Sequence, residues 1–281
     1  EQVGFRGDLP AFFEHLGSDD QFYFKTEQEA LQAYRDVQQK INPRLEQLFD
    51  IFPKADYEVR PVEAFRAASE AGASYQAPTP DGSRPGVFYL NTFNLKAQPN
   101  FLVETLSIHE ASPGHHFQIS IQQEVESLPD FRRFGGYTAY AEGWALYAES
   151  LGKEMGLFTD PYQWYGRLSD EQLRAMRLVV DTGLHYYGWD RQQAIDYMLA
   201  NSSMAESDVV AEVERYIVIP GQALAYKVGQ LRISALRARA ERKLGDGFDI
   251  RAFHDALLAE GALPLGVLEQ RMDAWIAAQP K

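Results

Sequence analysis

The sequence has no cysteine among its 281 residues. This absence excludes disulfide bonds, thiolate metal ligands and a cysteine nucleophile. No apolar run approaches the roughly 20 residues that a membrane-spanning helix needs, so we expect no membrane span in this chain. No signal segment is recognisable, and we leave both a cytoplasmic and an exported location open.

Basic residues are in the minority, with 27 Lys and Arg against 40 Asp and Glu, and a net charge of −13. A surface that binds nucleic acid needs clustered Lys and Arg to contact phosphates. No such cluster stands out, so nucleic acid is not an expected partner. Hydrophobic residues make up 45% and charged residues 24%, which is typical of a folded globular protein.

Apolar residues recur with a helical period over most of the chain, and strand-forming residues gather only near residues 57–93. Strands are predicted over 57–65 and 87–93, with a loop rich in Gly, Pro and Ser over 71–86. Ser169 and Gln172 have the spacing of a capping box and predict a helix start at 170. The predicted helices span 27–52 (interrupted near Pro43), 101–126, 138–155, 170–187, 191–199, 207–216, 222–244, 251–260 and 264–279. We expect one mainly α domain over 1–281 with a small sheet near 57–93.

Three of the six histidines, His109, His115 and His116, lie within eight residues in the segment HEASPGHHF. The zinc-hydrolase motif H-E-x-x-H places two histidines one helical turn apart, with the intervening Glu as general base. Here the position of the second histidine is occupied by Pro113, so the plain motif fails. A different pair of histidines is needed if this segment binds a metal.

Helix geometry offers two candidates for the second histidine. His116 lies on the same helical face as His109, but seven residues correspond to about 10.5 Å of axial rise, which is long for two ligands of one ion. Pro113 cannot donate a hydrogen bond to the carbonyl of His109, so the helix must bulge or kink. A bulge over Pro113 and Gly114 would bring His115 into the ligand position. We favour His115 and keep His116 as the alternative.

A third ligand is expected on a following helix. The segment YAEGWALYAE places Glu142 and Glu149 two turns apart on one face, and Glu142 comes 26 residues after His116. We predict that Glu142 is the third ligand and that Glu149 supports the ligands from behind. Three protein ligands leave a fourth position for water, the arrangement of a catalytic zinc site. One Zn²⁺ per chain is therefore expected.

These motifs resemble those of gluzincin metallopeptidases, in which a helix with two His and a Glu precedes a helix with a Glu ligand. HEASPGHH at 109–116 and EGWALYAE at 142–149 are still more similar to a bacterial family, domain of unknown function 885. DTGLH at 181–185 and PGQALAY at 220–226 also match that pattern. The resemblance extends from about residue 86 to 268. It implies a gluzincin-like catalytic domain that forms the C-terminal half of a longer protein and packs against an N-terminal region.

The resemblance also implies roles for individual residues. Glu110 would be the general base that activates the zinc-bound water. A tyrosine or histidine from a later helix would stabilise the oxyanion, with Tyr226 as the first candidate and His185 as the second. Residues 87–91 are an edge-strand candidate for pairing with an extended substrate, and Asn91 a candidate for holding a substrate terminus.

We therefore expect a zinc metallopeptidase that cleaves short peptides. A zinc esterase or amidase would need the same residues, because a fold and a site set the bond class only loosely. The alternative from another class is a non-catalytic binding module, or an incomplete half-domain, that retains a metal site.

Overall fold

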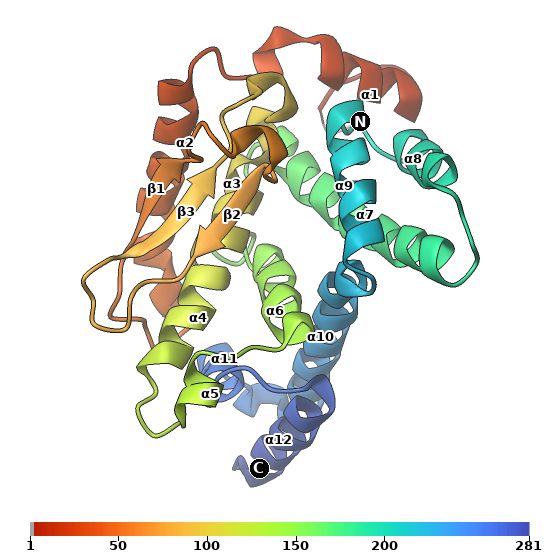
Figure 1. The fold of residues 1–281 in the computed structure, drawn as a ribbon. Helices are drawn as coiled ribbons and strands as arrows, with labels where there is room; N and C mark the ends of the chain where they lie inside the picture. Colours follow the sequence, from red (N-terminus) through yellow and green to blue (C-terminus); the bar gives the residue numbers. More distant parts are fainter. Residues whose placement is uncertain (1–2, 281) are drawn as a thin grey trace.

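The computed structural model describes residues 3–280 and shows a mainly helical protein with one small sheet (Figure 1). This confirms the predicted mainly α class. The α-helices are α1 (Leu9–Ser18), α2 (Glu27–Ile41), α3 (Val103–Leu106), α4 (His115–Glu124), α5 (Asp130–Arg133), α6 (Thr138–Ser150), α7 (Pro161–His185), α8 (Arg191–Ala200), α9 (Glu206–Val218), α10 (Ala225–Leu244), α11 (Ile250–Leu258) and α12 (Leu265–Ala278).

The sheet has three strands, β1 (Tyr57–Pro61), β2 (Ala73–Gln76) and β3 (Gly86–Leu90), in the order β1-β3-β2. β3 is parallel to β1 and antiparallel to β2, and every residue of β3 is buried. Two predictions are wrong here. The segment 71–86, predicted as loop, contains β2, and the strand predicted as an edge over 87–91 is the central one. The edge strand beside the site is β2.

Helix α2 covers one face of the sheet, where the Tyr34 ring lies 5.2 Å from that of Phe88 in an edge-on contact. Thr26 caps this helix by accepting a hydrogen bond from the backbone N–H of Glu29. The helix ends at Ile41, and Pro43 stands in the 3₁₀ turn that follows, so the interruption predicted near Pro43 is confirmed. This face belongs to the main hydrophobic core, which also includes side chains of α4, α6, α10, α11 and α12.

Helices α6 and α10 cross at two glycines with no side chain between them. A Cβ atom built on Gly143 of α6 would lie 2.4 Å from Cα of Gly229, and one built on Gly229 would lie 1.9 Å from the carbonyl oxygen of Ala139. Both distances are far below van der Waals contact, so the close crossing requires glycine at both positions. The crossing brings the start of α10, with Tyr226, towards Glu142 on α6.

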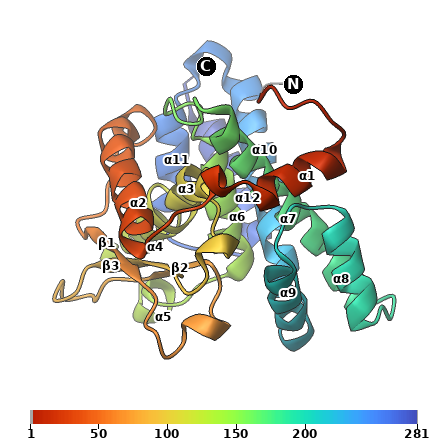
Figure 2. The ribbon, with the colours of Figure 1, turned by 90° about the horizontal axis from the view of Figure 1, so that it is seen from above.

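Helices α7, α8 and α9 form a separate layer with a smaller hydrophobic core of its own. Figure 2 shows α8 and α9 projecting away from the sheet. Helix α7 begins at Pro161, nine residues before its predicted start, because Asp160 caps it and proline is favoured in the first turn. Ser169 is therefore a mid-helix residue and not a cap. Helix α1 lies across the start of α7, where the Phe12 ring packs edge-on against Tyr165.

Candidate metal centre

The helical segment that carries the histidine cluster is broken at the predicted place. A π-helical turn, Ser107–Ala111, is followed by Ser112, a cis peptide bond to Pro113, and the start of α4 at His115. The N–H of Gly114 donates to the carbonyl of Ile108 (2.9 Å), and the Trp144 indole N–H donates to the carbonyl of Pro113 (2.8 Å). A Cβ on Gly114 would lie 2.0 Å from the His109 carbonyl oxygen, so the turn requires glycine.

The break places one nitrogen of His109 and one of His115 next to the same carboxylate. Oε2 of Glu142 lies 3.7 Å from Nε2 of His109 and 3.2 Å from Nε2 of His115. The two imidazole rings are perpendicular, with centroids 4.8 Å apart. One candidate ligand atom from each residue lies within 4.8 Å of the other two. The structure therefore brings together two histidines and a carboxylate with the geometry of a three-ligand set.

The electrostatics of the three groups favour a positive charge between them. Burial lowers the pKa of His109, but the carboxylates of Glu142 and Glu149 outweigh burial and hold that pKa well above its ordinary value. Burial opposes ionisation of Glu142, yet His115 and His109 hold the pKa of Glu142 well below its usual range. Oε2 of Glu142 is buried and accepts no hydrogen bond from the residues that the structure describes. A proton or a metal cation would compensate this buried charge.

Glu149 holds His109 from behind. Its Oε1 accepts a hydrogen bond from Nδ1 of His109 (2.7 Å), and its Oε2 accepts one from the Thr105 hydroxyl (2.8 Å). The guanidinium of Arg167 lies 3.6 Å away. Glu149 is fully buried, and this network turns Nε2 of His109 towards Glu142. A hydrogen bond of this kind sets the orientation and tautomer of a metal-binding histidine.

The candidate metal centre lies in a pocket of about 1050 Å³ that also contains Glu110 and Tyr226. The Glu110 side chain makes no hydrogen bond or ion pair with another residue of the described range 3–280. The Tyr226 ring is nearly parallel to that of His109, with centroids 6.2 Å apart. Five of the residues predicted for the site, His109, Glu110, His115, Glu142 and Tyr226, therefore line one cavity.

Three other predicted residues lie outside this pocket lining. His116 donates from Nε2 to the Ala55 carbonyl and accepts at Nδ1 from the Tyr75 hydroxyl. Burial lowers the pKa of His116 to about 4. His185 contacts the carbonyl of Tyr216 at 2.9 Å. Asn91 donates to backbone carbonyls of the turn before β2, at Ala67 and Glu70. The structure places His116, His185 and Asn91 in contacts that hold neighbouring segments together.

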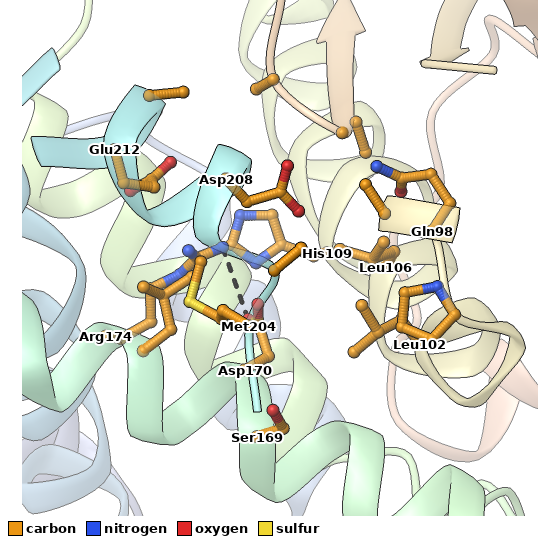
Figure 3. Close-up of a pocket in the computed structure, with 18 of the residues that line it drawn as sticks. Gln98, Leu102, Leu106, His109, Ser169, Asp170, Arg174, Met204, Asp208 and Glu212 are labelled. Atoms are coloured by element: carbon orange, nitrogen blue, oxygen red, sulfur yellow. Dashed lines mark ion pairs between the residues drawn. The ribbon is translucent and has the colours of Figure 1, made fainter. Parts of the chain in front are cut away.

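Sequence reasoning missed the wall of the pocket opposite the sheet. Asp170, Arg174 and Arg177 of α7 line it, as do Asp208 and Glu212 of α9, and Figure 3 shows four of these five side chains near His109. The residues recur at intervals of three or four, so each set lies on one helical face. Their spacing is also that of a solvated helix face, so the sequence carried no local signal that this face is buried.

Comparison with known proteins places most of the chain in one family. The model of a family described as "Bacterial protein of unknown function (DUF885)" matches residues 1–272. The structure of "the putative lipoprotein from Colwellia psychrerythraea" is 40% identical with a TM-score of 0.93, over 98% of this chain and 48% of that one. No curated protein matches the sequence.

A second solved structure, "a putative lipoprotein of unknown function from Shewanella oneidensis", is 22% identical with a TM-score of 0.76. The match covers 94% of this chain and 49% of that chain and shows a shared fold. The chain thus spans about half the length of both relatives. No helix within residues 3–280 is both long and apolar enough to cross a bilayer.

Proposed function

The chain belongs to the DUF885 family of bacterial proteins, and on that premise we propose that it is a gluzincin-like zinc-dependent hydrolase that cleaves short peptides. One observation carries the proposal. Nε2 of His109 and Nε2 of His115 both face Oε2 of Glu142, at 3.7 and 3.2 Å, and Glu110 lines the same pocket.

The three side chains fit a zinc ion. With zinc–ligand distances of about 2.0–2.2 Å and tetrahedral angles, neighbouring ligand atoms lie about 3.3 Å apart. The two separations at Glu142 are close to this value, and Oε2 of Glu142 has no hydrogen-bond partner among the described residues. Two imidazoles and one carboxylate form a common ligand set of catalytic zinc sites. A bound zinc ion would supply Lewis-acid activation of a water molecule.

In this proposal, two further side chains of the pocket move protons and bind the developing oxyanion. The Glu110 carboxylate accepts the proton of the attacking water and returns it to the leaving amine. The phenol of Tyr226 donates a hydrogen bond to the carbonyl oxygen as negative charge develops there. Glu149 keeps Nδ1–H of His109 fixed, so that Nε2 of this histidine stays directed at the ligand position.

Strand β2 supports a peptide as the substrate class. Ala73, Ser74 and Tyr75 of β2 line the pocket, and β2 is the edge of the sheet. An edge strand can pair with an extended peptide through main-chain hydrogen bonds. The pairing would lay the peptide along the segment that carries His109 and Glu110. An ester or another amide would not use this edge, so the peptidase is favoured over the esterase and amidase alternatives.

The relatives described as putative lipoproteins support an exported location for this chain. Because these relatives are about twice as long, packing against an N-terminal region is part of the proposal. Activity should therefore be measured both on residues 1–281 and on a longer protein that carries an N-terminal region like that of the relatives.

Metal content measured by mass spectrometry is the first test. We expect about one zinc per chain in the wild type after incubation with Zn²⁺ and removal of excess metal, as for a three-ligand site. His109→Ala, His115→Ala and Glu142→Ala should each lose it. The matched control is His116→Gln, which alters the neighbouring histidine and should keep the metal. No zinc in the wild type, or zinc retained in all three ligand variants, would overturn the proposal.

Turnover is the second test. Glu110→Gln should keep the zinc and lose about 10²-fold or more of kcat on a short peptide library, because general acid–base catalysis contributes about 10²–10⁴-fold. Loss of both zinc and activity would instead mean that Glu110 is needed to maintain the structure of the metal centre. A zinc-loaded wild-type protein that cleaves no peptide, alone or within the longer protein, would favour the binding-module alternative.

A further inference from the structure

Two arginines at the α7–α9 side of the pocket are buried but incompletely paired. Arg174 and Arg177 are 7% and 3% exposed, and both line the cavity. Nε of Arg174 and Nη1 of Arg177 are buried and have no hydrogen-bond partner among the described residues. Buried guanidinium groups are normally paired, because an unpaired buried donor costs free energy. The unused donors therefore indicate a missing acceptor.

The existing partners of both guanidinium groups hold them in place. Nε of Arg177 donates to Glu212 (3.1 Å) and to the Tyr216 hydroxyl (2.9 Å). Nη2 of Arg174 lies 3.4 Å from Asp170. A guanidinium carries five N–H donors, so these contacts leave donors available on each side chain. These contacts hold the two arginine side chains in place and leave some of their N–H donors available for another acceptor.

The two arginines lie one aromatic ring away from the candidate metal centre. Their guanidinium carbons are 4.6 Å (Arg174) and 4.4 Å (Arg177) from the centroid of the Tyr226 ring. That ring is itself nearly parallel to the ring of His109. Extended peptide spans roughly 3.3–3.6 Å per residue. A carboxylate one or two residues beyond a carbonyl held near His109 would reach the arginines.

A third arginine faces the same end of the pocket. Arg215 of α9 lines the cavity and makes no ion pair with another residue of the described part of the chain. Asp208, also on α9, lines the same pocket, and its carboxylate would repel a bound anion. Burial, and secondarily the charge of Glu212, raise the pKa of Asp208 to about 6, so this opposition is relieved only below about pH 6.

We propose that Arg174 and Arg177 bind a carboxylate of the substrate, so that the preferred substrates are short peptides with a free C-terminal carboxylate one or two residues beyond the cleaved bond. The planar fork of arginine matches a carboxylate with two parallel hydrogen bonds. This inference rests on the proposed hydrolase function and adds the cleavage direction, release of the C-terminal residue or dipeptide.

Binding tests the inference without turnover. Calorimetry on zinc-loaded Glu110→Gln should show N-acetyl-trialanine binding at least about 10-fold more tightly than its C-terminal amide, since hydrogen bonds to a charged group contribute about 1.5–3 kcal/mol. N-acetyl-dialanyl-glutamate amide carries its carboxylate on the side chain and separates the two sources of this group. Equal binding of acid and amide, no binding of either, or tighter binding of the side-chain acid would overturn the inference.

Substitutions of Arg174 test whether this side chain causes the preference for the acid over the amide. Arg174→Gln should reduce the ratio of the acid's affinity to the amide's affinity towards one. Arg174→Lys should restore part of this ratio, because lysine carries the positive charge but not the planar pair of donors. The matched control is Arg237→Gln on α10, which removes an arginine that pairs with Glu154 and does not line the pocket. It should leave the ratio unchanged. An unchanged ratio in Arg174→Gln would contradict the assignment.

Hydrolysis of the same three peptides separates this inference from the proposed function. Cleavage of the acid and its amide with equal kcat/KM would leave the hydrolase intact and refute the carboxylate subsite. Absence of zinc together with absence of cleavage would refute the hydrolase. The ratio of the acid and amide affinities, measured by calorimetry on the metal-free wild type, would then decide whether the pocket binds a carboxylate.

Discussion

The two walls of the pocket position their polar side chains in different ways. The wall formed by the π-helical turn, α4 and α6 depends on irregular backbone, a glycine that cannot be replaced, and a buried carboxylate behind His109. The wall formed by α7 and α9 depends on regular helices, with charged residues on one face of each. The first wall packs on the main core and the second on its own smaller core.

The two walls therefore place different requirements on the amino-acid sequence. Irregular backbone places His109 and His115 side by side although they are six residues apart, but it requires glycine at position 114. A regular helix presents residues three and four positions apart without special residues. The first wall should therefore be sensitive to single substitutions in its backbone, and the second to the balance of its charges.

The largest effect is expected behind His109. Glu149→Gln removes a fully buried carboxylate and leaves Arg167 without this partner, so we expect a loss of about 3–5 kcal/mol in the free energy of unfolding of the metal-free protein. Zinc affinity should fall by about 10–100-fold because His109 loses its orienting acceptor. Urea denaturation and zinc titration measure the two effects.

A matched control is Glu154→Gln, which breaks the half-exposed pair with Arg237. Its cost should stay within about 1 kcal/mol, because solvent screens exposed ion pairs. Equal losses in the two variants would mean that Glu149 contributes no more than a surface charge, and the first wall would not depend on the buried carboxylate behind His109.

The second-largest effect is expected at the turn between the π-helical segment and α4. Gly114→Ala would place a Cβ atom 2.0 Å from the His109 carbonyl oxygen and 2.3 Å from that of Ile108, so the turn must open. We expect a loss of about 2–3 kcal/mol, as for an overpacked core, together with weakened zinc binding. Gly136→Ala, where no atom lies within 4 Å of the new Cβ, should cost less than about 1 kcal/mol. A stable Gly114→Ala protein with unaltered metal affinity would refute this account.

The smallest effect is expected on the charged wall and depends on pH. Asp208 has a pKa of about 6 in the folded protein against 3.8 as its ordinary value. The protonated carboxyl therefore favours folding below about pH 4, and this contribution is lost as the pH rises through 6. Asp208→Asn should be about 1 kcal/mol more stable than the wild type at pH 8, after allowance for solvent screening, with no gain near pH 4.

Thermal denaturation of both proteins at the two pH values measures this difference. The control Asp196→Asn, on the exposed side of α8, should change stability equally at both pH values. A gain for Asp208→Asn that does not depend on pH would assign the effect to packing and not to ionisation.

The same contrast explains which parts of the structure could be predicted from the sequence. Pro113 and Gly114 inside an apolar helical segment, next to three histidines, indicate the irregular wall from the sequence alone and favour His115 over His116. The start of α7 was misplaced because Ser169 and Gln172 imitate a capping box, while Asp160 and Pro161 form the real helix start. β2 was missed because its four residues lie in a Gly- and Pro-rich segment and form a strand only beside β3.

The charged wall could not be predicted because nothing local distinguishes it. Arg174 and Arg177 have the spacing of any solvated helix face, and only the packing of α7 against α10 and α9 shows that this face is buried. Asn91 and His185 lie outside the pocket lining, since polar residues near a motif also serve to tie loops and helix ends to the fold.

The glycine crossing of α6 and α10 has a consequence for how the pocket can move. Two helices in backbone contact cannot slide or separate through side-chain rotations, so Glu142 and Tyr226 form one rigid unit on any timescale shorter than local unfolding. Helices α8 and α9 pack against α7 through the side chains of the smaller core, and such side-chain packing can shift. We therefore expect the pocket to admit its ligand by displacement of the α8–α9 layer, with amide hydrogens there exchanging faster than those of α6 and α10.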